Sequence, residues 1–149
     1  MLLAACDSAP SARPSASASV EQQRPRFIQG ELPVAAFVAK QVAGAPVPGK
    51  TLVYVGAPWC EPCQRFHRAL EAGELDGQLG GVRFIEYDSD RAREALAADG
   101  YASRLIPLFA VPGADGRATT KRIEGSIKGE GAVSNIMPRL ADLLARSTD

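Results

Sequence analysis

Two cysteines separated by two residues are the part of the sequence best suited to chemistry. Cys60 and Cys63 stand in the segment APWCEPCQRFH, residues 57–67, with an aromatic residue before them, a proline between them and the only histidine of the chain after them. Disulfide exchange needs one thiolate that attacks and a second thiol that attacks the resulting mixed disulfide. Two thiols at this spacing therefore predict a redox-active disulfide.

The expected secondary structure places this pair at the start of a helix. Residues 51–57, TLVYVGA, form a short, apolar and β-branched run that predicts a strand buried on both faces. Apolar side chains then recur at helical spacing from residue 60 to about residue 72, and Pro62 falls in the first turn, where proline is tolerated. The positive end of the helix dipole and the free N–H groups would stabilise a thiolate on Cys60.

The two residues between the cysteines are expected to tune the pair. Glu61 places a negative charge beside Cys60, which opposes thiolate formation, so we expect a more reducing couple than a neutral residue would give. Pro62 lacks an N–H donor that the helix start does not need, and it stiffens the turn that carries both sulfurs.

His67 opens an alternative, a metal site. The residues Cys60, Cys63 and His67 have the spacing Cys-x-x-Cys-x-x-x-His, and His67 lies one helical turn after Cys63. A structural zinc site has four ligands, and the only other cysteine or histidine is Cys6, far towards the N-terminus. Haem attachment is not expected either, because Gln64 directly follows the second cysteine. We expect no metal or other cofactor, and keep a metal-binding or non-catalytic binding module as the alternative function.

Composition restricts the remaining choices. The chain has 149 residues, 46% of them hydrophobic, which suits one domain with its own core. Its 17 basic and 17 acidic side chains leave no net charge, so nucleic acid is not an expected partner. We expect a monomer.

Strands and helices alternate along the chain, and the order predicts an α/β sandwich. A mainly parallel sheet of four or five strands would carry helices on both faces and an antiparallel edge. Pro138, inside the last helix, predicts a kink. In chain order we expect a strand at 26–29, a helix at 31–43, a strand at 51–57, a helix at 60–72, a strand at 82–88, a helix at 91–100, a strand at 108–112, a turn at 114–117, a strand at 119–125 and a helix at 129–145.

These features resemble the thioredoxin-like superfamily, and specifically its membrane-tethered periplasmic thiol-disulfide oxidoreductases. The resemblance covers about residues 27–146 and is carried by WCEPC at a strand-to-helix turn and by Ile106-Pro107 before the closing strands. It implies a three-layer sandwich around a central mixed sheet of four to five strands. It also implies that Cys60 is the nucleophile and Cys63 the resolving cysteine.

The same resemblance predicts how substrate is held. Trp59 matches the aromatic residue that flanks the cysteines, and Pro107 matches the cis-proline that faces the disulfide. With Pro107 cis, the backbone of Ile106 would pair with an extended substrate segment as an added strand. The expected partners are therefore protein or peptide thiols and disulfides, and we expect a protein-disulfide reductase more than an oxidase.

One departure from the family concerns the proton of the resolving cysteine. Thioredoxins often carry a buried aspartate six residues before the first cysteine, paired with a lysine on the neighbouring strand; here these positions hold Tyr54 and Phe84. A buried aspartate without the lysine, or the lysine without the aspartate, would be an unpaired buried charge and would cost several kcal/mol. The absence of both together is therefore physically consistent. The proton acceptor for Cys63 stays open between Glu61, Tyr54 and water.

The N-terminal segment predicts a membrane tether. Residues 3–6, Leu-Ala-Ala-Cys, resemble the lipobox of bacterial lipoproteins, in which Cys6 would be lipid-modified. Only five residues precede Cys6, fewer than a signal peptide needs, so residues 1–6 would be the remnant of one. Residues 7–26 are rich in Ser, Ala, Pro and Arg and predict a flexible tether, followed by the thioredoxin-like domain at 27–149. We expect a periplasmic protein, lipid-anchored to the membrane, with a membrane electron donor.

Overall fold

The strand that leads to the cysteines lies at the centre of a five-stranded sheet. The computed structural model describes residues 23–147. The strand order is β1-β3-β2-β4-β5, in which β1 and β3 run parallel to β2, while β4 and β5 form the antiparallel side. The strands are β1 (Arg26–Gln29), β2 (Thr51–Gly56), β3 (Arg83–Asp88), β4 (Leu108–Pro112) and β5 (Ala118–Glu124).

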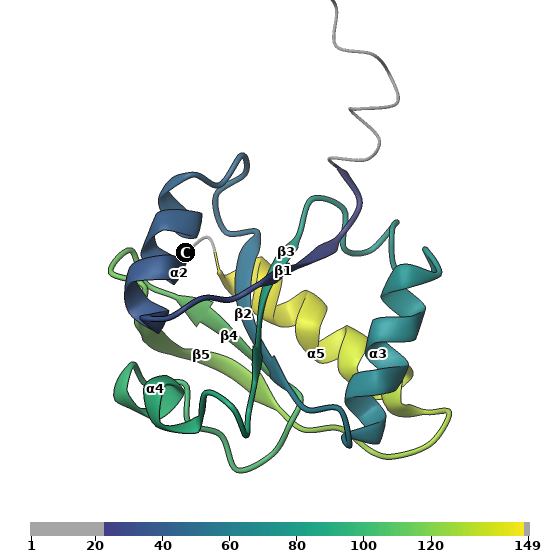
Figure 1. Cartoon of the computed structure of the whole chain (residues 1–149). Helices are drawn as coiled ribbons and strands as arrows, with labels where there is room; N and C mark the ends of the chain where they lie inside the picture. The colour runs from purple at the N-terminus through teal and green to yellow at the C-terminus, as the bar shows by residue number, and fades with distance from the viewer. Residues whose placement is uncertain (1–22, 148–149) are drawn as a thin grey trace, which may run out of the picture.

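Helices cover both faces of this sheet (Figure 1). The helices α3 (Glu61–Glu71) and α5 (Ala132–Arg146) pack together on one face. The opposite face carries α2 (Val34–Ala43) and α4 (Arg93–Ala98). This confirms the predicted α/β sandwich with a mixed sheet and helices on both sides.

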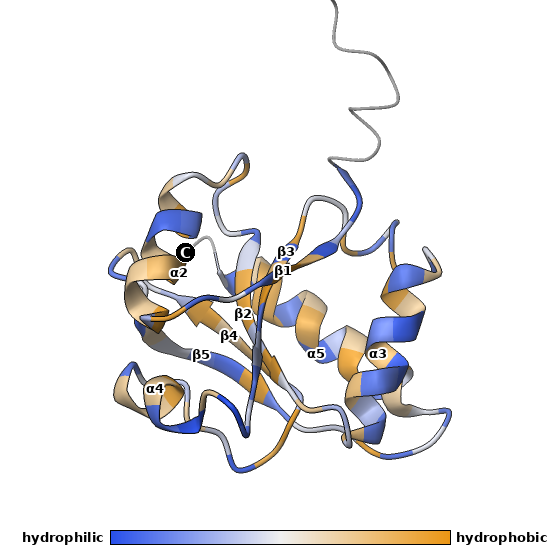
Figure 2. Cartoon of the chain, in the orientation of Figure 1, coloured by the Kyte–Doolittle hydropathy of each residue, from blue (hydrophilic) through white to orange (hydrophobic). Residues whose placement is uncertain are grey.

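Strand alternation divides the buried side chains between two clusters. Along β2, Leu52 and Tyr54 face α3 and α5, whereas Val53 and Val55 face α2 and α4. All six residues of β2 are buried, as predicted for a strand covered on both faces. Hydrophobic residues accordingly follow the central strands, while the outer surface of α3 is hydrophilic (Figure 2). The cluster on the α3 side is rich in aromatic residues, namely Tyr54, Phe66, Phe84 and Phe109, with Phe27 packed against it.

Several element ends differ from the predicted ones. The helix expected at 91–100 is limited to α4, residues 93–98, and the last helix begins at 132 rather than 129. The helix expected from 31 begins at 34, with Pro33 as its N-cap, and the Leu32-Pro33 peptide bond is cis. The helix α5 continues across Pro138, and the predicted kink there stays a prediction.

Candidate active site

Cys60 and Cys63 form a disulfide at the N-terminus of α3, with 5.2 Å between their Cα atoms. Cys60 is the N-cap residue, and its Sγ accepts a hydrogen bond from the backbone N–H of Cys63 at 3.3 Å. The carbonyl oxygen of Cys60 accepts the N–H of Gln64 at 3.0 Å, which begins the helical hydrogen-bond pattern. Backbone N–H groups at a helix start stabilise negative charge, so the sequence places the predicted nucleophile where a thiolate is favoured.

The turn between β2 and α3 holds the pair in place. The N–H of Cys60 donates to the carbonyl of Ala57 at 3.1 Å, which closes the turn after the strand. Pro62 is buried in the first turn of α3, as predicted. Cys60 and Cys63 are only 4% and 2% exposed, so both sulfurs are largely shielded from solvent.

A cavity of about 320 Å³ brings together two of the predicted substrate-binding residues, Trp59 and Ile106. Trp59 is 67% exposed, and its Nε1–H donates to Oδ2 of Asp90 at 2.8 Å. This hydrogen bond is the main reason that the pKa of the Asp90 carboxyl is lowered; desolvation opposes it, and Arg93 lowers the pKa further. The exposed indole is therefore anchored by a polar contact at one edge.

Ile106 lines this cavity and also contacts the buried core. Its side chain packs against the buried cluster that contains Cys60 and Cys63, and also against the cluster on the opposite face of the sheet. The Ile106-Pro107 peptide bond is cis, and Pro107 is buried directly before β4. The cis bond is the geometry that the family resemblance implies at this position.

Glu61 makes contacts that its position in the sequence did not reveal. Its Oε1 accepts the backbone N–H of Gly129 at 2.7 Å and Nε of Arg65 at 3.0 Å. The bond to Gly129 is the main reason that the carboxyl pKa is lowered, followed by the bond to Arg65. The ionised carboxylate therefore accepts hydrogen bonds from both groups, and it connects the start of α3 to the loop that precedes α5.

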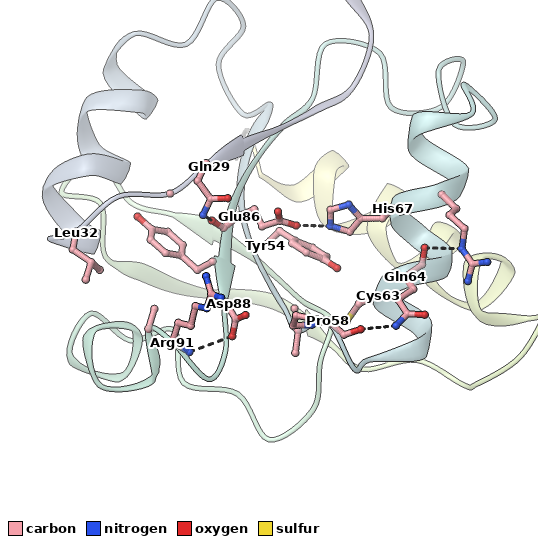
Figure 3. A pocket seen from close by; sticks show the side chains of 16 residues that line it. Gln29, Leu32, Tyr54, Pro58, Cys63, Gln64, His67, Glu86, Asp88 and Arg91 are labelled. Atoms are coloured by element: carbon pink, nitrogen blue, oxygen red, sulfur yellow. Dashed lines mark hydrogen bonds and ion pairs between the residues drawn. The ribbon is translucent and has the colours of Figure 1, made fainter.

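A second cavity, of about 650 Å³, reaches Cys63, the predicted resolving cysteine, from the side of β1 and β3 (Figure 3). Cys63 and His67 line it from α3, Tyr54 from β2 and Glu86 from β3. Tyr54 and Glu86 are direct partners in the β2–β3 register. Nε2 of His67 is paired with Oε2 of Glu86, which joins α3 to β3. Phe27 of β1 stacks on the imidazole, with 3.8 Å between ring centroids and 7° between planes.

Tyr54 and Phe84 occupy the positions at which thioredoxins often carry the charged pair, and both are buried in the aromatic cluster. The Tyr54 hydroxyl is buried without a hydrogen-bond partner among the described residues. Burial raises the pKa of this phenol far above its ordinary value, and the charge of Glu86 raises it further. Tyr54 is therefore a neutral phenol that can donate a proton in a hydrogen bond but cannot serve as the base for Cys63.

The structure does not assemble the alternative metal site. Cys60 and Cys63 are bonded to each other, and Nε2 of His67 is paired with Glu86. Among residues 23–147, no group of three or more His, Cys, Asp or Glu side chains has an arrangement that could hold a metal ion. Cys6 and the predicted signal-peptide remnant lie outside the described residues, as does most of the predicted tether. In the described part, no helix has the length and apolar character needed to cross a membrane.

Comparison with known proteins decides the family. The chain is 35% identical over 77 residues to thioredoxin Asp f 28 of Aspergillus fumigatus, an alignment that covers 52% of this chain and 67% of that protein. The chain belongs to the thioredoxin-like superfamily. Its fold is similar to that of a mutant thioredoxin from Halobacterium salinarum NRC-1, with a TM-score of 0.52, 23% sequence identity and coverage of 86% of this chain and 94% of that one. No protein-family profile matches the chain.

Family membership explains the geometry around the cysteines. In this thioredoxin-like protein the Cys60–Cys63 disulfide begins a helix directly after the central strand of the sheet. The protein is accordingly a thiol-disulfide oxidoreductase. Sequence reasoning located both cysteines, Trp59 and the Ile106-Pro107 bond, but it missed Glu86. The available signal for Glu86 was strand alternation, which puts it on the same face as the predicted core residue Phe84.

Proposed function

We propose that this thioredoxin-like oxidoreductase reduces disulfides in proteins or peptides. The observation that carries the proposal is the Cys60–Cys63 pair at the N-terminus of α3, where Cys60 caps the helix. Cys60 is the attacking residue because a helix start favours its thiolate. Cys63, one turn into the helix, is the resolving residue.

In the proposed reaction, the Cys60 thiolate attacks one sulfur of a substrate disulfide. The substrate S–S bond breaks, one substrate sulfur leaves as a thiolate, and the other remains bonded to Cys60. The Cys63 thiolate then attacks Sγ of Cys60 and releases the second substrate sulfur. The substrate gains two electrons and the dithiol of the enzyme becomes the disulfide, which a membrane electron donor would reduce again.

The cavity between Trp59 and Ile106 is the proposed contact for an extended substrate segment. An added strand that pairs with the backbone before Pro107 would bring its own disulfide towards Cys60, and main-chain pairing would accept many sequences. Glu61 and Pro62 belong to the proposed site as residues that tune the pair.

The location of the protein is a proposal that rests on the sequence alone. Lipid modification of Cys6, followed by the Ser/Ala/Pro-rich residues 7–26, would hold a monomeric domain at the periplasmic surface of a membrane. Electron transfer from a membrane donor would then occur at short range.

Trapping of mixed disulfides tests the reaction. In a Cys6→Ser background, Cys63→Ser should accumulate covalent complexes with disulfide-containing proteins, because attack occurs but resolution does not. The matched variant Cys60→Ser should form none. The complexes are counted on non-reducing gels and should disappear with reductant. Absence of complexes in Cys63→Ser, together with a metal that co-purifies with the unmutated site, would favour the alternative of a metal-binding or non-catalytic binding module.

A further inference from the structure

We propose that the His67–Glu86 pair accepts the proton of Cys63 when this cysteine attacks the mixed disulfide, through water in the cavity that Tyr54 also lines. The inference rests on the proposed exchange reaction and adds its proton acceptor. It assigns a role in exchange to His67, Glu86 and Tyr54, for which the family resemblance implies none.

The resolving step creates the need for an acceptor. Cys63 is 2% exposed and lies within α3, so few groups can take its proton directly. Its side chain lines the 650 Å³ cavity whose wall also contains His67 and Glu86. Residues four apart on a helix have Cβ atoms about 5–6 Å apart, so the imidazole lies on the same side of α3 as Cys63. A single water occupies about 30 Å³, so the cavity has room for a bridging molecule.

The pair has the chemistry of a base that is held in position. With His67 neutral, Nε2–H donates to the Glu86 carboxylate and Nδ1 is left with a lone pair that can accept a proton. The proton would turn the pair into an imidazolium beside a carboxylate, a favourable charge arrangement. The Phe27 ring stacked at 3.8 Å, and the edge of Tyr54 at 5.6 Å, fix the imidazole orientation.

Tyr54 is assigned as a positioning residue. Its hydroxyl is buried without a partner among the described residues, and Figure 3 shows it directed towards the α3 side of the cavity, where Cys63 and His67 lie. A Cβ atom at Gly56 would lie 2.7 Å from this hydroxyl oxygen, so the glycine leaves the hydroxyl its space. As a neutral phenol it can donate a hydrogen bond to the bridging water or to the Cys63 thiolate.

The other charged or titratable groups around the cavity are less suited to the task. The Asp88 carboxylate of β3 already accepts the backbone N–H groups of Asp90 and Arg91. The Tyr87 hydroxyl donates to a backbone carbonyl, and burial raises its pKa to about 12. Arg68 of α3 and Arg91 are exposed cations on the cavity wall. From β1, the Gln29 amide lines the cavity and the Phe27 ring stacks on the imidazole, and neither side chain is titratable.

The proton and electron balance of the step is complete. The S–H bond of Cys63 breaks and its proton passes through water to the pair. The thiolate forms the S–S bond with Cys60 while the bond between Cys60 and the substrate sulfur breaks. The substrate leaves as a thiolate and takes a proton from solvent, and the pair returns its own proton to water.

Two kinetic phases separate this proposal from the exchange reaction on which it rests. The reduced full chain, in a Cys6→Ser background, is mixed with a symmetric aromatic disulfide that releases a coloured thiolate. Attack by Cys60 releases the first thiolate at a rate proportional to reagent concentration. Resolution by Cys63 releases the second thiolate at a rate independent of it.

The variants His67→Gln and Glu86→Gln should slow the second phase by at least about tenfold, since a positioned base typically contributes more than this. The first phase should change by less than about twofold. The control Glu71→Gln makes the same carboxylate-to-amide change at an exposed end of α3 and should leave both phases unchanged. The second-phase rate of the unmutated protein should rise with pH, because a base must be unprotonated to accept the Cys63 proton, and His67→Gln should weaken this rise.

Tyr54→Phe keeps the ring and its packing, so it tests the same step even where the other variants fold poorly. It should slow the second phase and spare the first. Unchanged second-phase rates and pH profiles in His67→Gln, Glu86→Gln and Tyr54→Phe would overturn the proposal. Absence of the first phase in the unmutated protein would instead overturn the proposed exchange reaction.

Discussion

Glu61 lies directly after Cys60, the proposed nucleophile, and its carboxylate accepts hydrogen bonds from Gly129 and Arg65. Replacement by Gln removes the negative charge beside Cys60, so we expect a larger thiolate fraction on Cys60 in the reduced protein. Because the charge is shared and exposed to solvent, the increase should be only roughly two- to fivefold. Alkylation rates of the reduced protein as a function of pH measure the thiolate fraction, with Glu71→Gln as the control. A smaller thiolate fraction in Glu61→Gln would mean that the bond to Gly129 supports Cys60 more than the charge opposes it.

At the same scale, the sequence could identify residues whose chemistry is local. Cys60 and Cys63 are recognisable by their spacing, and their helix start follows from the strand before them. The partner of His67 could not be predicted in the same way. Glu86 is 19 residues further along the chain and reaches His67 only after α3 packs beside β3. The acceptor for Cys63 was therefore left open, because strand pairing and helix packing decide it together.

Two glycines with positive φ show how an element is held by what packs on it. Gly116, φ 80°, lies in the β4–β5 turn, where a Cβ atom would come 1.9 Å from the carbonyl oxygen of Ala35 in α2. At Gly129, φ 88°, an added Cβ atom would have no neighbouring atom within 4 Å. Gly129→Ala should cost about 1–2 kcal/mol of unfolding free energy for the left-handed backbone alone. Gly116→Ala should cost clearly more, because α2 must also move away from the turn.

Urea unfolding of both variants measures the difference, with the denaturant slope checked for a common unfolded state. Equal losses would mean that the contact between the hairpin turn and α2 is loose and contributes nothing to stability. Residual exchange activity of Gly116→Ala distinguishes a shifted helix from a molecule that no longer folds.

Element identity followed from the sequence, whereas element ends did not. The pattern of apolar residues predicted the strands at 26–29 and 108–112 with the bounds that the structure has. The helices were predicted too long at 91–100 and too early at 129, because turns that flank a helix share its composition. The helix predicted at 31–43 was also too long, because Pro33 precedes α2 as its N-cap.

At the scale of the whole molecule, strand order is what assembles the site. Placing β3 between β1 and β2 puts Glu86 beside Tyr54 in register and brings Phe27 over His67. Strand and helix patterns predicted the sandwich but not this order, which depends on how the crossovers pack. The same order puts Cys60 and Cys63 in the cluster on the α3 and α5 side of the sheet, while Tyr101 and Leu96 belong to the cluster on the α2 and α4 side.

The direction of electron flow is a property of the whole molecule, because a reduction potential is a difference in stability between two folded forms. A thiol-disulfide oxidoreductase that acts as an oxidant has a stabilised reduced form and a reduction potential of about −120 mV. A reductase needs the reverse, a stabilised disulfide form and a potential near or below about −250 mV. If the protein is a reductase, its oxidised form should therefore unfold at a higher temperature than its reduced form. Thermal unfolding with and without reductant, in a Cys6→Ser background so that only Cys60 and Cys63 change state, measures this directly. A reduced form that is more stable than the oxidised form would make the protein a disulfide donor and reverse the proposed direction.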